Sequence, residues 1–288
     1  MNRKKVTILD LQDKKDKGVP ITMLTAYDYP TGLLVDRAGI DIILVGDSLA
    51  MVVLGHENTV SVTMEEMLHH CRAVARGAQN PLLIGDMPFL SYQVDAKEAV
   101  RNAGRFLKEG GMDVVKLEGG REMAPTVRAI VDAGIPVMGH IGLTPQSISK
   151  LGGFRVQGRD VAGAKALIDD ALALQEAGAF SLLLEAIPAP VARLITERMV
   201  IPTVGIGAGP DCDGQVLVLH DLIGLFDRFV PRFAKPYANV FATVTQALET
   251  YRQEVMARAF PGPEHSYSMS DEALETLLEE LAEPSWVG

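Results

Sequence analysis

Short apolar runs rich in Val, Ile and Leu recur along the chain, and segments of helical composition separate them. Runs of this length with few polar interruptions are typical of strands buried on both faces of a parallel sheet. Eight strands are therefore predicted, and they cover residues 21–28, 40–47, 81–88, 113–120, 136–143, 180–187, 202–209 and 216–224.

The segments between these runs carry the start and stop signals of helices. Residues 63–78 open with Thr63, and Glu66 follows three residues later, which is the pattern of a capping box. Four predicted helices end in Ala-Gly or Gly-Gly just before a strand, where glycine suits a left-handed C-cap. These glycines are Gly39, Gly111, Gly134 and Gly178.

Strand and helix alternate eight times, which predicts an α/β fold in which a parallel sheet closes into a (β/α)8 TIM barrel. The competing architecture is an open doubly wound sheet, whose GxGxxG turn should follow the first strand. That strand runs instead into AYDYPTG, which lacks the pattern. We predict a single barrel domain over residues 1–260, with a short N-terminal plug in residues 1–19. Residues 261–288 are predicted to form an acidic C-terminal appendage, with a helix from about Asp271.

Composition narrows the class of protein and its partners. The chain has 288 residues, of which 48% are hydrophobic and 22% charged, as in ordinary soluble globular proteins. The net charge of −10 argues against a nucleic-acid partner. Cys71 and Cys212 lie far apart without a CxxC pair, so we expect no disulfide framework and a cytoplasmic location. Since no window offers about 18 consecutive apolar residues, no membrane span is expected.

Polar residues cluster at the predicted carboxyl ends of the strands, where barrels of this kind carry their active sites. A single acid there is usually a helix cap, and a lysine could simply pair with a neighbouring glutamate. Several acids, a lysine and a histidine spread over five strands instead indicate one functional cluster. Its members are Asp47, Ser48, Asp86, Lys116, Glu118, His140 and Glu185.

Carboxylates gathered at a dry barrel mouth repel one another unless a cation neutralises them. Oxygen ligands without cysteine favour a hard divalent ion, magnesium above zinc. A 2-oxo acid could chelate such an ion through its carboxylate and ketone oxygens. The ion would then act as a Lewis acid and stabilise the enolate formed when a base removes a neighbouring proton.

Several motifs together resemble the ketopantoate hydroxymethyltransferase family over residues 5–260, namely GDSLAMVVLGHENTVSVTMEEML, LIGDMPFLSY, VVKLEGG, VMGHIGLTPQS, LLLEAIP and TVGIGAG. The resemblance implies a magnesium-dependent barrel enzyme of the phosphoenolpyruvate/pyruvate superfamily, with one Mg²⁺ per subunit. Such enzymes transfer a hydroxymethyl group from the co-substrate 5,10-methylenetetrahydrofolate to 3-methyl-2-oxobutanoate, giving 2-dehydropantoate. This is the first committed step of pantothenate biosynthesis. The resemblance also implies a homodecamer built as a pentamer of dimers.

The resemblance assigns a role to each strand-end residue. Asp47 and Asp86 correspond to metal ligands that also contact substrate, Glu118 to the third metal-site acid, Ser48, Lys116 and His140 to substrate contacts, and Glu185 to the general base. One alternative is a superfamily lyase or mutase, which usually carries a cysteine in a KKCGH-type loop that this chain lacks. Another is a non-catalytic metabolite-binding barrel, which would have lost Asp47, Asp86 or Glu185.

Overall fold

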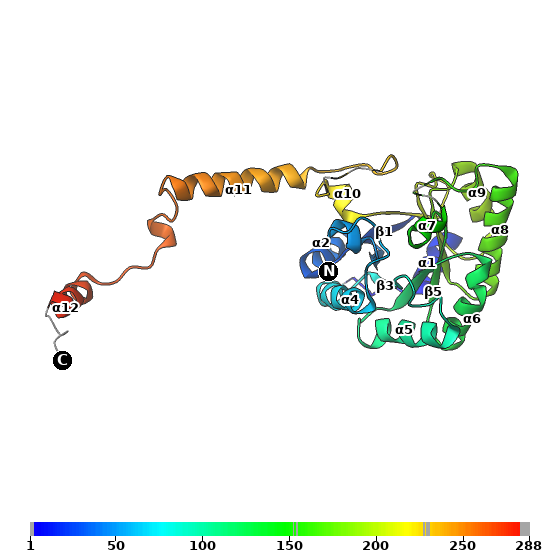
Figure 1. The fold of residues 1–288 in the computed structure, drawn as a ribbon, viewed down its shortest axis with the longest axis horizontal. Helices are drawn as coiled ribbons and strands as arrows, with labels where there is room; N and C mark the ends of the chain where they lie inside the picture. The colour runs from blue at the N-terminus through cyan, green and yellow to red at the C-terminus, as the bar shows by residue number, and fades with distance from the viewer. Residues whose placement is uncertain (1–2, 152, 154, 227, 229–230, 283–288) are drawn as a thin grey trace. The chain divides into compact units, whose positions relative to one another are not determined.

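Eight parallel strands close into a barrel in the order β1-β2-β3-β4-β5-β6-β7-β8, which confirms the predicted (β/α)8 fold (Figure 1). The computed structural model describes residues 3–151, 153, 155–226, 228 and 231–282. The strands are β1 (Ile21–Thr25), β2 (Ile42–Val45), β3 (Leu82–Asp86), β4 (Val114–Glu118), β5 (Val137–Gly142), β6 (Ser181–Glu185), β7 (Thr203–Ile206) and β8 (Gly214–Leu217).

Helices surround the strands on the outside of the barrel (Figure 1). Those that precede or connect strands are α1 (Ile8–Asp16), α2 (Tyr29–Arg37), α3 (Leu49–Val52), α4 (Met64–Gly77), α5 (Ala96–Lys108), α6 (Ala124–Asp132), α7 (Ile148–Leu151), α8 (Val161–Glu176) and α9 (Ala189–Arg198). Short 3-10 turns, Arg121–Met123 and Pro145–Ser147, follow β4 and β5. The predicted capping box is confirmed, since Thr63 accepts the N–H of Glu66 at the start of α4.

The end of the barrel differs from the prediction in two places. Residues 207–213, between β7 and β8, form no helix. The strand predicted over residues 216–224 was too long, because β8 ends at Leu217 and residues 219–223 form the short helix α10 (Leu219–Ile223). The N–H of Leu219 donates to Thr25 Oγ1 at 2.9 Å, and Gly224 ends the helix with a left-handed φ of 64°. The remote bond from Thr25 and the glycine C-cap favour a helical turn although the sequence there is apolar.

Two apolar layers lie on the two sides of the sheet because side chains alternate along each strand. On β3, Leu82 and Ile84 belong to the core inside the barrel, whereas Leu83 packs in the outer layer between the strands and the helices. Asp86 is the next position with the same alternation as Leu82 and Ile84. In the same way, Lys116 follows the interior residue Val114. Asp86 and Lys116 thus continue the inward-facing rows of the barrel.

The N-terminal segment closes the opposite end of the barrel, as the sequence predicts. Leu11 of α1 is fully buried and belongs to the interior core. Lys14 contacts Asp41 at 2.6 Å, and Lys15 contacts Asp213 at 2.7 Å. Both aspartates lie just before strands β2 and β8, so charged pairs anchor the plug around its apolar centre.

The chain divides into two compact units, residues 1–238 and 239–288. The second unit contains α11 (Val240–Met256), a 3-10 turn (Pro263–His265) and α12 (Asp271–Ala282), whose first residue agrees with the predicted acidic helix. The division of the chain at residue 260 stays a prediction. Among the residues that the structure describes, no helix is both long and apolar enough to cross a membrane.

Candidate active site

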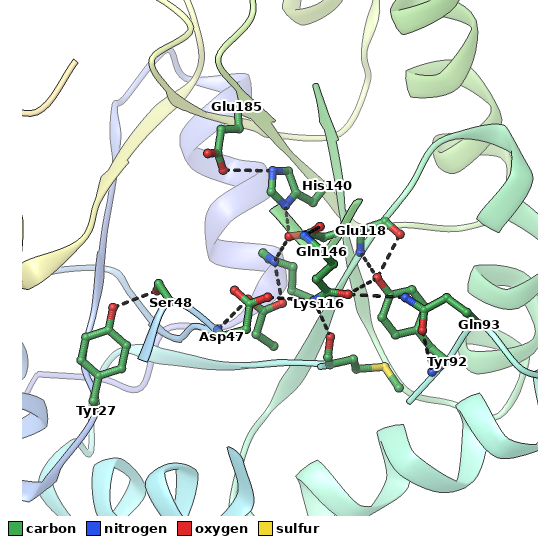
Figure 2. Close-up of polar contacts among 12 residues, drawn as sticks. Tyr27, Asp47, Ser48, Tyr92, Gln93, Lys116, Glu118, His140, Gln146 and Glu185 are labelled. Atoms are coloured by element: carbon green, nitrogen blue, oxygen red, sulfur yellow. Dashed lines mark hydrogen bonds and ion pairs between the residues drawn. The ribbon is translucent and has the colours of Figure 1, made fainter. Parts of the chain in front are cut away.

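The register of the sheet brings the polar strand-end residues side by side. Asp86 on β3 lies opposite Lys116 on β4, and Glu118 on β4 lies opposite His140 on β5. None of these four side chains is more than 5% exposed, and Asp47, just beyond β2, is equally buried. Figure 2 shows Lys116 and Glu118 converging with Asp47 and His140. The structure therefore brings these residues together in one cluster, as expected from the sequence.

One lysine lies among three buried carboxylates. Lys116 Nζ is 2.5 Å from Asp86 Oδ1 and 4.0 Å from Glu118 Oε1. The backbone N–H of Asp47 donates to Asp86 Oδ2 at 3.1 Å, which places the Asp47 carboxylate beside this pair. The simple ion pair considered from the sequence was between Lys116 and Glu118, but Asp86 is the closer partner.

The electrostatics of this cluster show an excess of negative charge. Burial, together with the neighbouring Asp86 and Glu118, raises the pKa of Asp47 well above its ordinary value. Burial also raises the pKa of Asp86, although Lys116 opposes the change. For Lys116, burial favours the neutral amine, but the surrounding carboxylates outweigh it and raise the pKa. A single ammonium group does not balance three carboxylates.

These residues fit a divalent cation. Glu118 Oε1 is buried and has no hydrogen-bond partner among the described residues, so a lone pair is free for a ligand. Within the same described part of the chain, no three Asp, Glu, His or Cys side chains already surround one point closely enough to bind a metal. Magnesium takes one or two protein carboxylates and fills its other positions with water and substrate oxygens. Asp47 and Asp86 are the residues that could hold it directly, and Glu118 through water.

His140 lies between two glutamates. Its Nδ1 is 3.4 Å from Glu118 Oε1, and its Nε2 is 3.3 Å from Glu185 Oε2 (Figure 2). Neither ring nitrogen has hydrogen-bond geometry with a described residue, so the attraction is mainly one of charge. Burial and Lys116 lower the pKa of His140, but the two glutamates outweigh them and raise it to about 9. His140 is therefore protonated at neutral pH and holds a positive charge between the two acids.

Glu185 ends β6 with its side chain 16% exposed, which leaves the carboxylate open to the cavity. The helix-cap alternative does not hold, because the N-cap of α9 is Pro188 and no side chain makes a capping bond there. Asp47 likewise does not cap the short helix α3, whose N-cap is Ser48. Ala186, the residue after Glu185, has a left-handed φ of 48°, which is uncommon for a residue with a side chain.

A cavity of about 350 Å³ opens at this end of the barrel. It is large enough for a small oxo acid and part of a second ligand. All the predicted site residues line it: Asp47, Ser48, Asp86, Lys116, Glu118, His140 and Glu185. The Ser48 hydroxyl lies 2.9 Å from the hydroxyl of the buried Tyr27, which fixes its position (Figure 2).

Two residues that support the site were missed from the sequence. Gln146 Nε2 donates to Asp47 Oδ2 at 2.9 Å, and its backbone N–H donates to Glu118 Oε2 at 3.0 Å. Its Oε1 accepts the hydroxyl of Tyr92 at 2.7 Å, and Tyr92 in turn accepts the N–H of Glu118 at 3.1 Å. Both residues are buried and hold two of the acids in place. Their presence in the motifs LIGDMPFLSY and VMGHIGLTPQS was the available signal.

Comparison with known proteins agrees with the motifs. The sequence model of the ketopantoate hydroxymethyltransferase family matches residues 5–263. The 3-methyl-2-oxobutanoate hydroxymethyltransferase of Moorella thermoacetica is 62% identical over 265 residues, covering 92% of this chain and 98% of the relative. The enzyme of the same name from Heliobacterium modesticaldum is 58% identical over 269 residues, covering 93% of this chain and 98% of the relative.

Solved structures of similar shape are more distant in sequence. Phosphonopyruvate hydrolase in complex with oxalate and magnesium has a TM-score of 0.60 at 14% identity, covering 96% of both chains. A 2,3-dimethylmalate lyase of the PEP mutase/isocitrate lyase superfamily has a TM-score of 0.58 at 14% identity, covering 95% of both chains. At this identity the likeness shows the fold alone.

Proposed function

Because this chain belongs to the ketopantoate hydroxymethyltransferase family and is therefore a transferase, we propose that it makes 2-dehydropantoate from 3-methyl-2-oxobutanoate. The one-carbon donor in this proposal is 5,10-methylenetetrahydrofolate. The observation that carries the proposal is the position of Glu185. Its partly exposed carboxylate lines the same cavity as the buried acids Asp47, Asp86 and Glu118. A base beside an oxo-acid site is what removal of a proton next to the ketone requires.

The residues divide the work between binding and proton transfer. Lys116 and Ser48 bind the anionic oxo acid, since the ammonium supplies a countercharge and the hydroxyl a donor. The C3–H bond then breaks, and its proton passes to Glu185 while the electron pair stays on the substrate. Protonated His140, 3.3 Å away, holds the Glu185 carboxylate towards the cavity. The C3 carbon bonds to the methylene carbon of the donor as the bond from that carbon to one donor nitrogen breaks. Water then supplies the hydroxyl oxygen and displaces the second nitrogen. The proton held by Glu185 and one proton of the water pass to the two nitrogens, and tetrahydrofolate leaves.

A divalent ion, magnesium in this proposal, would be held by Asp47 and Asp86 and would supply Lewis acidity at the ketone of the bound oxo acid. A related fold offers a parallel, because phosphonopyruvate hydrolase has been crystallised with magnesium and oxalate. Glu118 would contribute at longer range, because its Oε1 accepts no hydrogen bond from a described residue and can bind a water molecule.

The test separates proton removal from binding. Purified protein with magnesium and both substrates should form 2-dehydropantoate, detected by mass spectrometry. Without any folate, it should exchange the C3 hydrogen of 3-methyl-2-oxobutanoate with D₂O, detected by proton NMR. Glu185→Gln should reduce both rates by about 10²–10⁴-fold, because only the proton acceptor is lost. Glu197→Gln, which removes an exposed carboxylate on α9, is the matched control and should exchange like the wild type.

Exchange at the wild-type rate in Glu185→Gln would remove Glu185 from the mechanism. Failure of the wild type to form product from the folate donor would contradict the proposed reaction itself. A lyase or mutase activity on a 2-oxo acid, the remaining enzymatic alternative, would appear as cleavage or rearrangement of the substrate in the same assay.

Assembly and location belong to the same proposal. We propose a homodecamer, a pentamer of dimers, working in the cytoplasm, since the family resemblance implies the first and the two separated cysteines favour a reducing compartment. Light scattering of the purified protein measures the subunit number directly, and any value other than ten would contradict it.

A further inference from the structure

Asp221 is a buried acid on the cavity that the proposed mechanism does not use. It lies on α10, just after β8, and it is 7% exposed. Its carboxylate faces the same cavity as Asp47 and Glu185. Among the described residues it forms no hydrogen bond or ion pair, and burial alone raises its pKa to about 6. At neutral pH this acid is therefore mostly ionised, and its oxygens can accept hydrogen bonds from a ligand.

Asp221 is held rigidly close to the reaction site. The Leu219 N–H bond to Thr25 Oγ1 ties the start of α10 to β1. Burial raises the pKa of the Tyr27 hydroxyl, and the nearby carboxylates of both Asp221 and Asp47 raise it further. The two acids thus lie within electrostatic reach of one hydroxyl, which itself contacts Ser48 at 2.9 Å. A ligand bound at Asp221 would lie next to the oxo-acid site.

The wall around Asp221 is apolar and partly aromatic, and its rim is cationic. Phe226 and Phe233 line the cavity, and Phe233 is 39% exposed. Arg155 and Arg232, both exposed, line it as well. An occupant therefore needs N–H donors for the buried acid, a flat apolar part for the aromatic walls, and negative charge for the arginines. The oxo acid does not meet this description, since its carboxylate would repel Asp221.

We propose that Asp221 recognises the ring of the one-carbon donor by accepting two hydrogen bonds from its 2-amino-4-oxo face. This inference rests on the proposed function, because it takes the donor to be a folate. The ring's N3–H and 2-amino group form a donor pair that matches the two oxygens of a carboxylate. The benzoyl portion would then lie against the phenylalanines, and the glutamate carboxylates would reach the arginines. Asp221 acts in this arrangement as a specificity residue for the donor.

The test pairs a protein change with a ligand change. Tetrahydrofolate, and an analogue with methyl in place of the 2-amino group, are titrated by calorimetry into the wild type and Asp221→Asn. We expect Asp221→Asn to bind tetrahydrofolate about 10–100-fold more weakly, as for loss of a charged hydrogen bond. The analogue should show a similar loss on the wild type, with little further loss on the variant. Asp211→Asn, which removes an exposed carboxylate outside the cavity, is the control.

The folate-free exchange of the C3 hydrogen reports on the oxo-acid side of the site and on folding. Asp221→Asn should keep this exchange, and Asp221→Ser serves as a second variant if the first does not fold. Equal binding of tetrahydrofolate by wild type and Asp221→Asn would overturn the inference while leaving the proposed function intact. If Asp221→Asn bound tetrahydrofolate and the analogue more weakly by the same factor and also lost the exchange, Asp221 would have a structural role. That result would also overturn the inference. Absence of tetrahydrofolate binding to the wild type would contradict both proposals.

Discussion

Gln146 offers a sharp test of how the buried acids are held. Gln146→Leu keeps a side chain of similar size in a site that is 4% exposed, but it removes the side-chain amide with its N–H donors and its carbonyl acceptor. Asp47 Oδ2 and the carbonyl oxygen of Met87 then lose donors that lie at 2.9 and 3.0 Å. Tyr92 keeps its bonds to the backbone of Glu118. Two buried acceptors are therefore left unsatisfied.

Each unsatisfied buried group costs about 1–3 kcal/mol, so Gln146→Leu should lower the free energy of unfolding by about 2–6 kcal/mol. Urea unfolding followed by circular dichroism measures this change. Because Asp47 would no longer be oriented, magnesium affinity measured by titration calorimetry should fall about 10–100-fold, as for loss of an outer-shell partner of a metal ligand.

Gln93→Leu provides the matched control for this prediction. Gln93 donates to the same Gln146 amide at 3.4 Å but contacts no carboxylate of the cluster. It should leave magnesium affinity unchanged. If Gln146→Leu lost stability yet bound magnesium like the wild type, Gln146 would be a packing residue only. Wild-type values for both quantities would refute the reasoning from buried hydrogen bonds.

Three further substitutions test two residues of the active-site cluster, Asp86 and Lys116, and one buried acid away from it, Asp36. Asp86→Asn should bind magnesium at least about 10-fold more weakly by calorimetry; unchanged affinity would exclude Asp86 from the metal site. Lys116→Met should raise KM for the oxo acid or lower kcat about 10–100-fold; wild-type kinetics with a lower melting temperature would show a purely structural ion pair. Burial would raise the pKa of Asp36, but hydrogen bonds from N–H groups of Gln79 and Asn80 outweigh it and lower the pKa. Ionised Asp36 therefore stabilises the folded protein above pH about 4, and this stabilisation is lost as the pH falls below that value. In Asp36→Asn, the free energy of unfolding measured with urea should fall less steeply as the pH is lowered. The same pH dependence in variant and wild type would contradict this prediction.

Much of the site could be predicted because residues such as Asp86 and Lys116 continue the two-residue alternation of their strands. The interior rows of β3 and β4 run apolar up to Ile84 and Val114 and then become polar at Asp86 and Lys116. A change from apolar to polar within one inward-facing row is visible in the sequence. Strand pairing then brings the rows together without further information, since the barrel fixes the register.

The supporting residues could not be found in this way because their partners are remote and lie outside the strands. Gln146 sits in a short turn after β5, and the carboxylate that it holds is 99 residues earlier in the chain. Asp221 follows an apolar run that resembles more strand, whereas Leu219 is drawn into a helix by Thr25 of another strand. Local patterns carry no record of such pairings.

The N-terminal plug has a consequence for the order in which the barrel assembles. Lys15 reaches Asp213, which is 198 residues further along the chain and immediately precedes β8. Helix α1 therefore cannot complete its docking until nearly the whole barrel has been synthesised. Contacts of such wide sequence separation slow folding and leave apolar surface exposed in the nascent chain. Leu11 is thus made before all eight strands of the barrel and is among the last residues to be covered.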